Sequence, residues 1–181
     1  TYALVLLSLP VYWFLLATYG IEGLDPLSLE GNAVRALDLK LIGANHMYMG
    51  EGIAFDPEGL LTTLPSIANI VAGYAAGLFV QRERDEKNTR IDLMLVGASI
   101  CLAAMVWDLA FPINKKLWTS SYVLLTIGLD LVILGLLMWF LPKDKKLPGW
   151  GTFFQTAGKN PLAIYLLSEL ALITLYTLPA G

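Results

Sequence analysis

Residues 118–141 read WTSSYVLLTIGLDLVILGLLMWFL, and Asp130 is the only charged residue in this run. A helix needs about 20 mostly apolar residues to cross the hydrocarbon core of a bilayer, so the run predicts a membrane span. Lipid-exposed backbone must satisfy its own hydrogen bonds, which favours helices over strands. Four other stretches are apolar enough for spans, namely residues 2–20, 60–80, 92–111 and 161–178. The sequence therefore predicts an all-α, polytopic transmembrane helix bundle of about five spans, forming a single domain over residues 1–181.

The composition supports a chain that lives in lipid. Hydrophobic residues make up 56% of the sequence, charged residues make up 15%, and the mean hydropathy is +0.63. A soluble domain carries about 25% charged residues. The net charge of -3 and the single Cys101 argue against a nucleic-acid-binding protein and a disulfide scaffold. The chain begins at Thr1 without a basic leader, and we interpret it as part of a longer polypeptide whose missing half completes the bundle.

Basic residues are unevenly divided between the loops on the two sides of the predicted bundle. Loops 81–91 and 142–160 hold eight Lys or Arg residues, whereas loop 21–57 and turn 112–117 hold four. Lys and Arg gather in cytoplasmic loops, so we expect the first pair to face the cytoplasm. Loop 21–57 and turn 112–117 are then expected to face outward together.

The long outer loop contains a short periodic segment. Across residues 33–42, apolar residues recur at helical spacing, with Arg35, Asp38 and Lys40 between them. This pattern is typical of an amphipathic helix that lies in the membrane interface, with its polar residues toward water.

Three residues of the outer loop are candidates for binding an acceptor. His46 is the only histidine and offers a general base or a hydrogen-bond donor, and a role as a surface or capping residue stays open. With one histidine and no second ligand beside it, no metal site is predicted. Asp56 and Glu58 belong to the segment Asp-Pro-Glu-Gly, which opens the second span. Asp56 is suited to cap that helix and Pro57 to start it, and the functional alternative is that either carboxylate binds a sugar or its amine.

The last two spans carry further candidates. Asn160 and Pro161 are suited to begin the final span, and the run Gly158-Lys159-Asn160 is also a candidate site for the diphosphate of CoA. Ionisable residues inside a span are costly unless they are paired or face the bundle interior. We expect this of Asp130 and Glu169, for which functional and structural roles both stay open. Asp108 lies near a span end, where reaching Lys115 or Lys116 would explain it.

Four segments, taken in order, resemble one known family. They are His46-Met-Tyr48, Phe55-Asp-Pro-Glu-Gly-Leu-Leu61 with Leu64-Pro-Ser-Ile67, Pro112-Ile-Asn-Lys-Lys-Leu-Trp118 with Ser121-Tyr-Val123, and Gly158-Lys-Asn-Pro161 leading to Glu169. Together they are similar to the carboxy-terminal half of the heparan-alpha-glucosaminide N-acetyltransferase family, over about residues 25–169. Members of this family span lysosomal and bacterial membranes several times. The resemblance implies a bacterial member in the cytoplasmic (inner) membrane.

The resemblance also implies an activity for the full-length protein. An acetyl group would pass from cytoplasmic acetyl-CoA, a co-substrate and not a tightly bound cofactor, to an amino sugar or related glycan outside. The catalytic histidine proposed for the family lies ahead of this chain, and His46 matches a different histidine. Asn114, Lys115 and Glu169 join the acceptor-side candidates, with Asn114 and Glu169 as orienting residues. Ser168 stands where the lysosomal relatives carry histidine, which leaves shared chemistry at Glu169 open.

Two other functions fit the same sequence. A proton-coupled or small-solute transporter would use Asp130 and Glu169 as a path through the bundle. A non-catalytic membrane subunit would need a partner chain to complete the helices. Assembly as a homodimer, the acceptor and the acyl length stay open.

Overall fold

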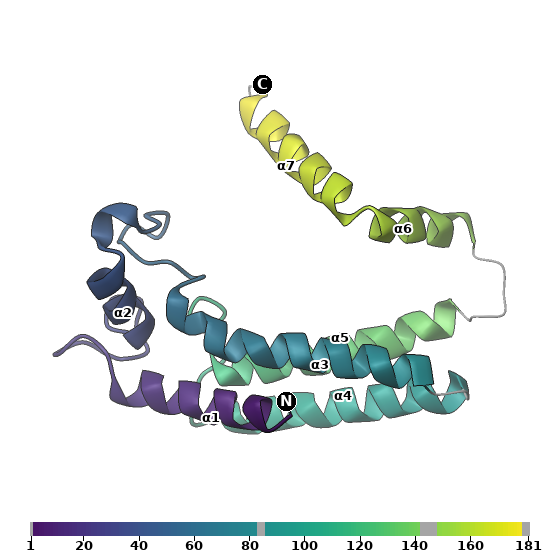
Figure 1. Cartoon of the computed structure of the whole chain (residues 1–181), viewed down its shortest axis with the longest axis horizontal. Helices are drawn as coiled ribbons and strands as arrows, with labels where there is room; N and C mark the ends of the chain where they lie inside the picture. Colours follow the sequence, from purple (N-terminus) through teal and green to yellow (C-terminus); the bar gives the residue numbers. More distant parts are fainter. Residues whose placement is uncertain (1, 83–85, 142–147, 179–181) are drawn as a thin grey trace. The chain divides into compact units, whose positions relative to one another are not determined.

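The computed structural model describes residues 2–82, 86–141 and 148–178, and its regular secondary structure there is entirely helical (Figure 1). One isolated β-bridge joins Gly20 and Asn32. The helices in chain order are α1 (Tyr2–Thr18), α2 (Ala33–Leu41), η1 (Ala44–His46), η2 (Leu60–Thr62), α3 (Thr63–Arg82), α4 (Glu86–Asp108), α5 (Ser120–Phe140), α6 (Gly149–Lys159) and α7 (Pro161–Thr177). The prediction of an all-α polytopic protein is confirmed.

Several of these helices are suited to cross a membrane. Three described helical segments are long and apolar enough by themselves, namely Leu60–Arg82, Lys87–Asp108 and Ser120–Phe140. The pair α6 and α7 passes the same test only together, and its two helices meet at an angle of 97°. Helix α1 is apolar but shorter, at 17 residues. This set agrees roughly with the five predicted spans, and α6 is a helix that the sequence analysis did not predict.

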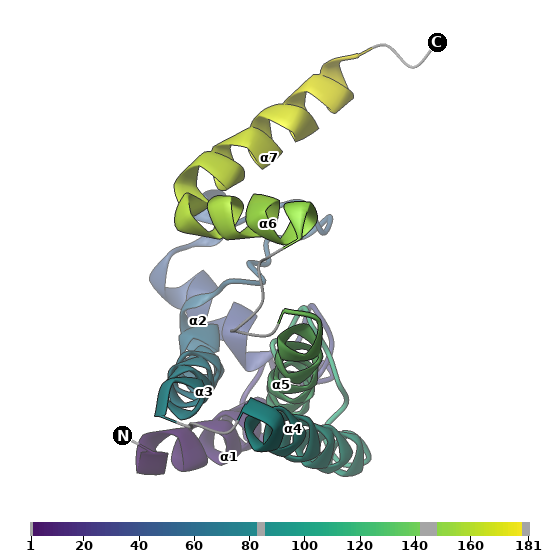
Figure 2. The same cartoon turned by 90° about the vertical axis from the view of Figure 1, so that its right-hand side faces the viewer.

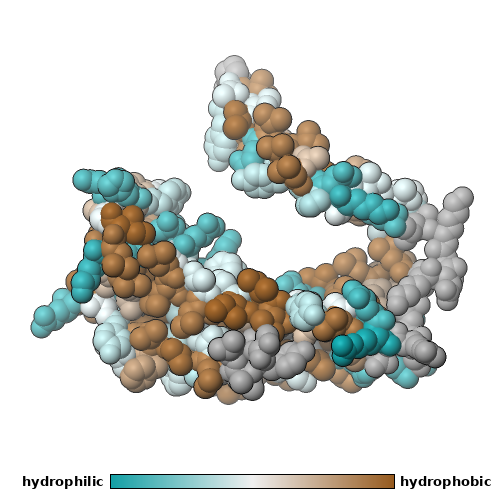
Figure 3. Space-filling model, in the orientation of Figure 1, coloured by the Kyte–Doolittle hydropathy of each residue, from teal (hydrophilic) through white to brown (hydrophobic). Residues whose placement is uncertain are grey.

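The chain divides into two compact units, which are described separately. Residues 1–137 form the first unit and residues 138–181 form the second. In the first unit, α3, α4 and α5 run beside one another, and α1 packs against α3 (Figures 1 and 2). Figure 3 shows hydrophilic surface gathered at both ends of these helices and hydrophobic surface between them. This distribution is expected of helices whose middle parts lie in lipid.

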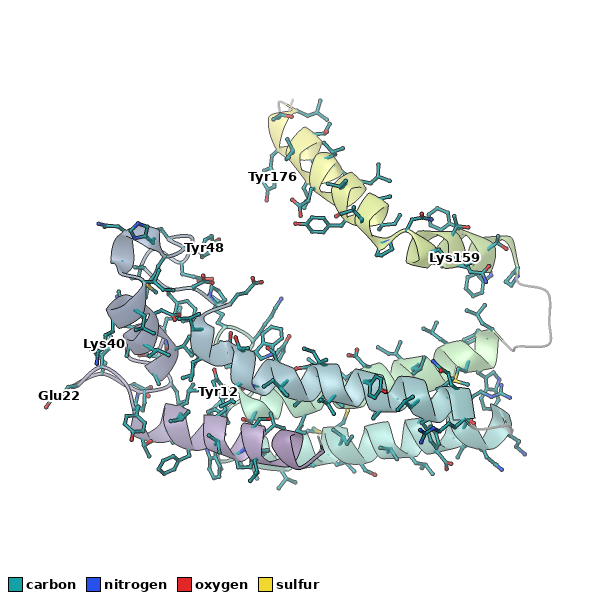
Figure 4. All side chains as sticks on the ribbon, viewed as in Figure 1. Tyr12, Glu22, Lys40, Tyr48, Lys159 and Tyr176 are labelled. Atoms are coloured by element: carbon teal, nitrogen blue, oxygen red, sulfur yellow. The ribbon has the colours of Figure 1, made fainter. Side chains whose placement is uncertain are left out.

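Loop 21–57 and turn 112–117 meet at one end of the first unit, which we call the loop end. A buried cluster holds them there, made of Tyr12, Leu16, Val34, Phe55, Phe111 and Leu117. The hydroxyl of Tyr12, which is labelled on α1 in Figure 4, donates to the carbonyl oxygen of Leu117 at 2.5 Å. Lys116 in the turn also pairs with Glu51 in the loop, at 2.5 Å. The two connections are therefore in contact at one end of the helices, and the side of the membrane that they face stays a prediction.

Helices α4 and α5 approach closely through glycine. A Cβ atom added at Gly128 would lie 2.7 Å from the carbonyl oxygen of Gly97 and 2.8 Å from the backbone nitrogen of Cys101. Small residues allow helices in membranes to pack at such short range. By contrast, a Cβ added at Gly73 or Gly77 on α3 would meet no atom within 4 Å.

Helix α2 confirms that the periodic segment of the outer loop is helical. It begins after Asn32, whose side-chain oxygen accepts from the backbone N–H of Arg35 at 2.8 Å. The predicted polar face is only partly correct, however. Lys40 is exposed, whereas Asp38 is completely buried.

Candidate functional site

The Asp-Pro-Glu-Gly segment forms a turn that precedes the helix. The side-chain oxygen Oδ1 of Asp56 accepts from the backbone N–H of Glu58 at 2.9 Å, and the Gly59 N–H donates to the Asp56 carbonyl at 3.1 Å. Helical structure begins at Leu60 with η2. The prediction that Asp56 caps this helix and Pro57 starts it is therefore wrong. Asx turns of this kind compete with helix starts for the same short side chains.

The cap comes instead from Asp38 on α2. Its Oδ1 atom accepts from the backbone N–H of Leu60 at 3.2 Å. Its Oδ2 atom is buried without a hydrogen-bond partner in the described residues. Burial raises the pKa of this carboxyl, the hydrogen bond from Leu60 lowers it, and the charge of Asp56 raises it further. Asp38 therefore fixes the position of the Asp-Pro-Glu-Gly turn relative to α2, a role that the sequence analysis missed.

The turn between α4 and α5 is held by its own polar side chains. The side-chain oxygen of Asn114 accepts from the backbone N–H groups of Lys116 at 2.9 Å and Leu117 at 3.3 Å. Thr119 Oγ1 donates to the Pro112 carbonyl at 2.9 Å. Asn114 thus sets the shape of the turn that leads into Trp118.

Asp108 also belongs to this turn. Its Oδ1 atom accepts from the backbone N–H of Ile113 at 2.6 Å. The predicted approach of Asp108 to Lys115 or Lys116 is wrong, because Lys116 pairs with Glu51 and neither lysine pairs with Asp108 within the described residues.

Trp118 has an unusual backbone conformation. Its φ angle is +51°, in the left-handed region that bulky residues rarely adopt. Its ring packs edge-on against Tyr122, with 5.3 Å between ring centroids. The indole nitrogen Nε1 is buried and has no hydrogen-bond partner in the described part of the chain. Strain of this kind persists only where surrounding contacts impose it, and it gathers at functional sites.

Trp118 and Glu58 line one pocket, which we call the loop-end pocket. It has a volume of about 320 Å³ and is lined by Pro57, Glu58, Thr62, Thr63, Ser66 and Trp118. The Glu58 carboxylate offers hydrogen-bond acceptors, the Thr63 hydroxyl offers a donor and an acceptor, and the indole offers an apolar face. The hydroxyls of Thr62 and Ser66 already donate to backbone carbonyl oxygens and retain only their acceptor capacity. The pocket therefore joins the Asp-Pro-Glu-Gly segment to the Asn-Lys-Lys-Leu-Trp segment, which lie far apart in the sequence.

The other acceptor-side candidates lie outside the lining of this pocket. His46 ends the short helix η1 and is exposed, as is Lys115. Asp56 and Asn114 shape the two turns that carry Glu58 and Trp118. The structure thus places Glu58 in the lining of the loop-end pocket, and Asp56 and Asn114 in the two turns that carry this lining.

A second pocket, with a mostly apolar lining, lies between α3 and α5, and Asp130, which was expected to face the bundle interior, is exposed at its edge. It has a volume of about 240 Å³, and its lining includes Asn69, Gly73, Gly77 and Asp130. Asn69 Nδ2 lies 3.3 Å from Thr126 Oγ1, and Asn69 Oδ1 has no partner in the described residues. We call this the mid-helix pocket. Within the described ranges, no group of three or more His, Cys, Asp or Glu side chains could hold a metal ion.

The remaining candidates belong to the second unit. Asn160 Nδ2 donates back to the Thr156 carbonyl at 2.9 Å, so its side chain caps the end of α6. The prediction that Asn160 caps the start of α7 is wrong, because its side chain makes no hydrogen bond to that helix. Gly158, Lys159 and Glu169 are exposed within this unit.

The sequence is similar to two mammalian enzymes that share one name. It is 30% identical over 156 residues to the heparan-alpha-glucosaminide N-acetyltransferase of Mus musculus, and 30% identical over 154 residues to that of Homo sapiens. Each alignment covers 77% of this chain but only 23% of the relative, so the chain spans about a quarter of the relatives that it matches. No family model matches the chain.

Proposed function

Because this chain is related to the heparan-alpha-glucosaminide N-acetyltransferase family, we propose that it forms part of an integral-membrane acyltransferase. The acceptor, an amino sugar or related glycan, binds at the loop-end pocket, and acetyl-CoA is the donor. One observation carries this proposal. Two of the four segments that carry the family resemblance contribute Glu58 and Trp118 to a single pocket.

The chemistry of the pocket suits an amino sugar. The Glu58 carboxylate accepts hydrogen bonds from sugar hydroxyls or an ammonium group, and the Trp118 ring offers a flat apolar surface. A site built to pair with polar groups discriminates strongly against acceptors that lack them.

The transfer itself needs groups beyond this chain. The acceptor nitrogen forms a bond to the acetyl carbon, the thioester C–S bond breaks, the amine loses a proton and CoA leaves as its thiol. The base that takes the proton belongs to the amino-terminal half of the full-length protein. The part of this chain is to hold the acceptor, with Asp38, Asp56 and Asn114 fixing the turns that carry the pocket.

The proposed orientation places the loop end outside a bacterial inner membrane. Acetyl-CoA then arrives from the cytoplasm, and its diphosphate binds at Gly158, Lys159 and Asn160. Cysteines introduced at Lys115 and Gln81 test this orientation in intact cells. An impermeant maleimide is expected to label Lys115→Cys and not Gln81→Cys, and the opposite labelling would refute it.

Acetyl transfer by the full-length protein tests the role of the pocket. Glu58→Gln is expected to raise the KM for a glucosamine-ended acceptor about 10- to 100-fold, the loss that follows from one charge-assisted hydrogen bond. Trp118→Leu, which removes the flat aromatic surface, is expected to raise it as well. The KM for acetyl-CoA should not change. Glu22→Gln, at an exposed loop carboxylate, is the matched control. Unchanged acceptor KM in both folded pocket variants would refute this site, and no CoA release with any amine or hydroxyl acceptor would refute the activity.

A second function is favoured by the mid-helix pocket. An acidic residue inside a span that lines a pocket is also what a proton or solute path requires, and Asp130 has this position. Asp130→Asn and Glu169→Gln would then abolish flux into proteoliposomes that contain no CoA. Flux that survives in both variants would exclude this function.

A further inference from the structure

Helix α6 has two chemically distinct faces. At about 100° per residue, Trp150, Phe153, Phe154 and Ala157 fall on one side of the helix. Thr152, Gln155, Thr156 and Lys159 fall on the opposite side. Trp150, Phe153 and Phe154 are 50%, 65% and 63% exposed, so the second unit itself leaves this apolar face uncovered.

Helix α7 has no such division. It is apolar on all sides, and Glu169 is its only charged residue. At about 1.5 Å per residue its 17 residues span roughly 25 Å, close to the thickness of the hydrocarbon core. A helix that is apolar all round is typical of a membrane span. Its composition therefore assigns α7, and not α6, to the bilayer interior.

The angle between the two helices then fixes the direction of α6. They meet at 97°, so a helix joined to a crossing α7 runs along the membrane surface. The corner is built into the sequence. The backbone N–H and the side chain of Asn160 both donate to the last turn of α6, and Pro161 starts α7 without an N–H to continue the first helix.

We infer that α6 lies in the plane of the membrane as an interfacial helix, and that its partner is an anionic phospholipid surface. The apolar face enters the boundary of the acyl chains, where Trp and Phe side chains are favoured. The polar face and Lys159 remain at the level of the headgroups, where a CoA diphosphate that arrives from the cytoplasm would also meet Lys159. Charge supports the anionic partner, because the sequence of the preceding residues 142–147 contains three further lysines against one aspartate. This inference does not depend on the proposed acyltransferase function.

Site-directed spin labelling of the full-length protein tests the position of α6. Single cysteines replace Phe153 and Ala157 on the apolar face and Thr152 and Gln155 on the polar face, with all native cysteines, including Cys101, changed to Ala. The labelled protein is reconstituted in nanodiscs of phosphatidylcholine and phosphatidylglycerol. Collision with oxygen and with a water-soluble nickel chelate then reports depth. Leu167→Cys on α7 and Lys115→Cys in the exposed turn serve as the deep and aqueous references.

The expected result is a contrast between the two faces. Labels at 153 and 157 should lie about 5–10 Å below the headgroups and be protected from nickel, and labels at 152 and 155 should be accessible to it. Equal protection at all four sites would overturn the inference, because α6 would then belong to a bent span or be covered by protein. Equal accessibility would also overturn it, because α6 would then lie in water. Nanodiscs of phosphatidylcholine alone should reduce the contrast, and an unchanged contrast would refute the anionic partner.

Discussion

The loop end of the first unit and helix α7 of the second unit differ in how far their apolar side chains are buried. At the loop end, Tyr12, Phe55 and Leu117 are essentially without exposed surface. On α7, every described side chain is exposed within its unit, and Tyr176 is 87% exposed (Figure 4). The first region buries its apolar side chains against itself, whereas the second presents them to whatever surrounds it.

This difference shows which region is stabilised by contacts within its own unit and which region depends on its surroundings. A buried aromatic side chain contributes through the area it removes from water and through close packing. A side chain on α7 gains nothing comparable from its own unit and depends on lipid or on other protein. Substitutions at the loop end should therefore be costly in detergent solution, and those on α7 should have little effect there.

The largest effect is expected from Phe55→Ala, which removes a fully buried ring from the loop-end cluster. Truncating a buried Phe costs about 3–5 kcal/mol of unfolding free energy, because a cavity remains. Leu166→Ala on α7, at a position 52% exposed, is the matched control and should change stability by less than about 0.5 kcal/mol. Denaturant unfolding in detergent micelles measures both. Equal losses in the two variants would remove the contrast between the regions.

A second contrast lies within the first unit, between a packed and an open glycine. Gly128→Ala places a methyl group against backbone atoms of α4 and should cost about 1–3 kcal/mol. Gly73→Ala meets open space and should be neutral or slightly stabilising, because alanine favours the helix. Thermal unfolding of the two variants compares them. A loss at Gly73 that matches the loss at Gly128 would show that α3 is packed there by another part of the protein.

The sequence predicted the helices far better than it predicted the contacts between them. The apolar runs alone indicated α1, α3, α4, α5 and α7, because span length is set by the thickness of the bilayer. Helix α6 was missed because its 11 residues are too few and too mixed to suggest a span. Its alternation of aromatic and polar residues at helical spacing was a signal that could have identified it.

The loop-end pocket likewise depends on contacts between residues that the sequence alone did not predict. The family resemblance had already singled out the segments that contain Glu58 and Trp118, but no sequence rule brings them together across the fold. The left-handed backbone of Trp118 is imposed by tertiary contacts and has no signal in the residue itself. Asp38 did leave a signal, since it lies four residues after Val34 and therefore on the buried face of α2.

Asp38 gives the third prediction, because it stabilises the loop end through one hydrogen bond across two elements. Asp38→Ala leaves the partly buried N–H of Leu60 without its acceptor and should cost about 1–2 kcal/mol. Asp38→Asn retains an oxygen at this position and should recover most of that loss. Urea unfolding at neutral pH measures both variants. Equal destabilisation by Ala and Asn would show that the carboxylate charge, and not the hydrogen bond, is what matters.

The same residue should make loop-end stability depend on pH. Burial is the main cause that raises the pKa of Asp38 above the value of about 3.9 expected in the unfolded chain. Between those two pKa values the folded state binds more protons, so the free energy of unfolding falls as the pH rises from about 4. Asp38→Asn lacks this titration. The stability of the wild type relative to Asp38→Asn should therefore decrease with rising pH in a series of unfolding curves, and an increase would contradict the assigned direction.

The smallest effect is expected from the ion pair between Lys116 and Glu51, although it also joins the turn to the long loop. Both partners retain solvent contact, with 49% and 25% of their side chains exposed, so water and salt screen their attraction. A double-mutant cycle of Lys116→Ala and Glu51→Ala should give a coupling free energy of about 0.2–1 kcal/mol. Because the pair is screened, the coupling should shrink when the salt concentration is raised, whereas the loss in Phe55→Ala should persist. A coupling of several kcal/mol that resists salt would mean that charge pairing, and not the buried cluster, holds the two connections together.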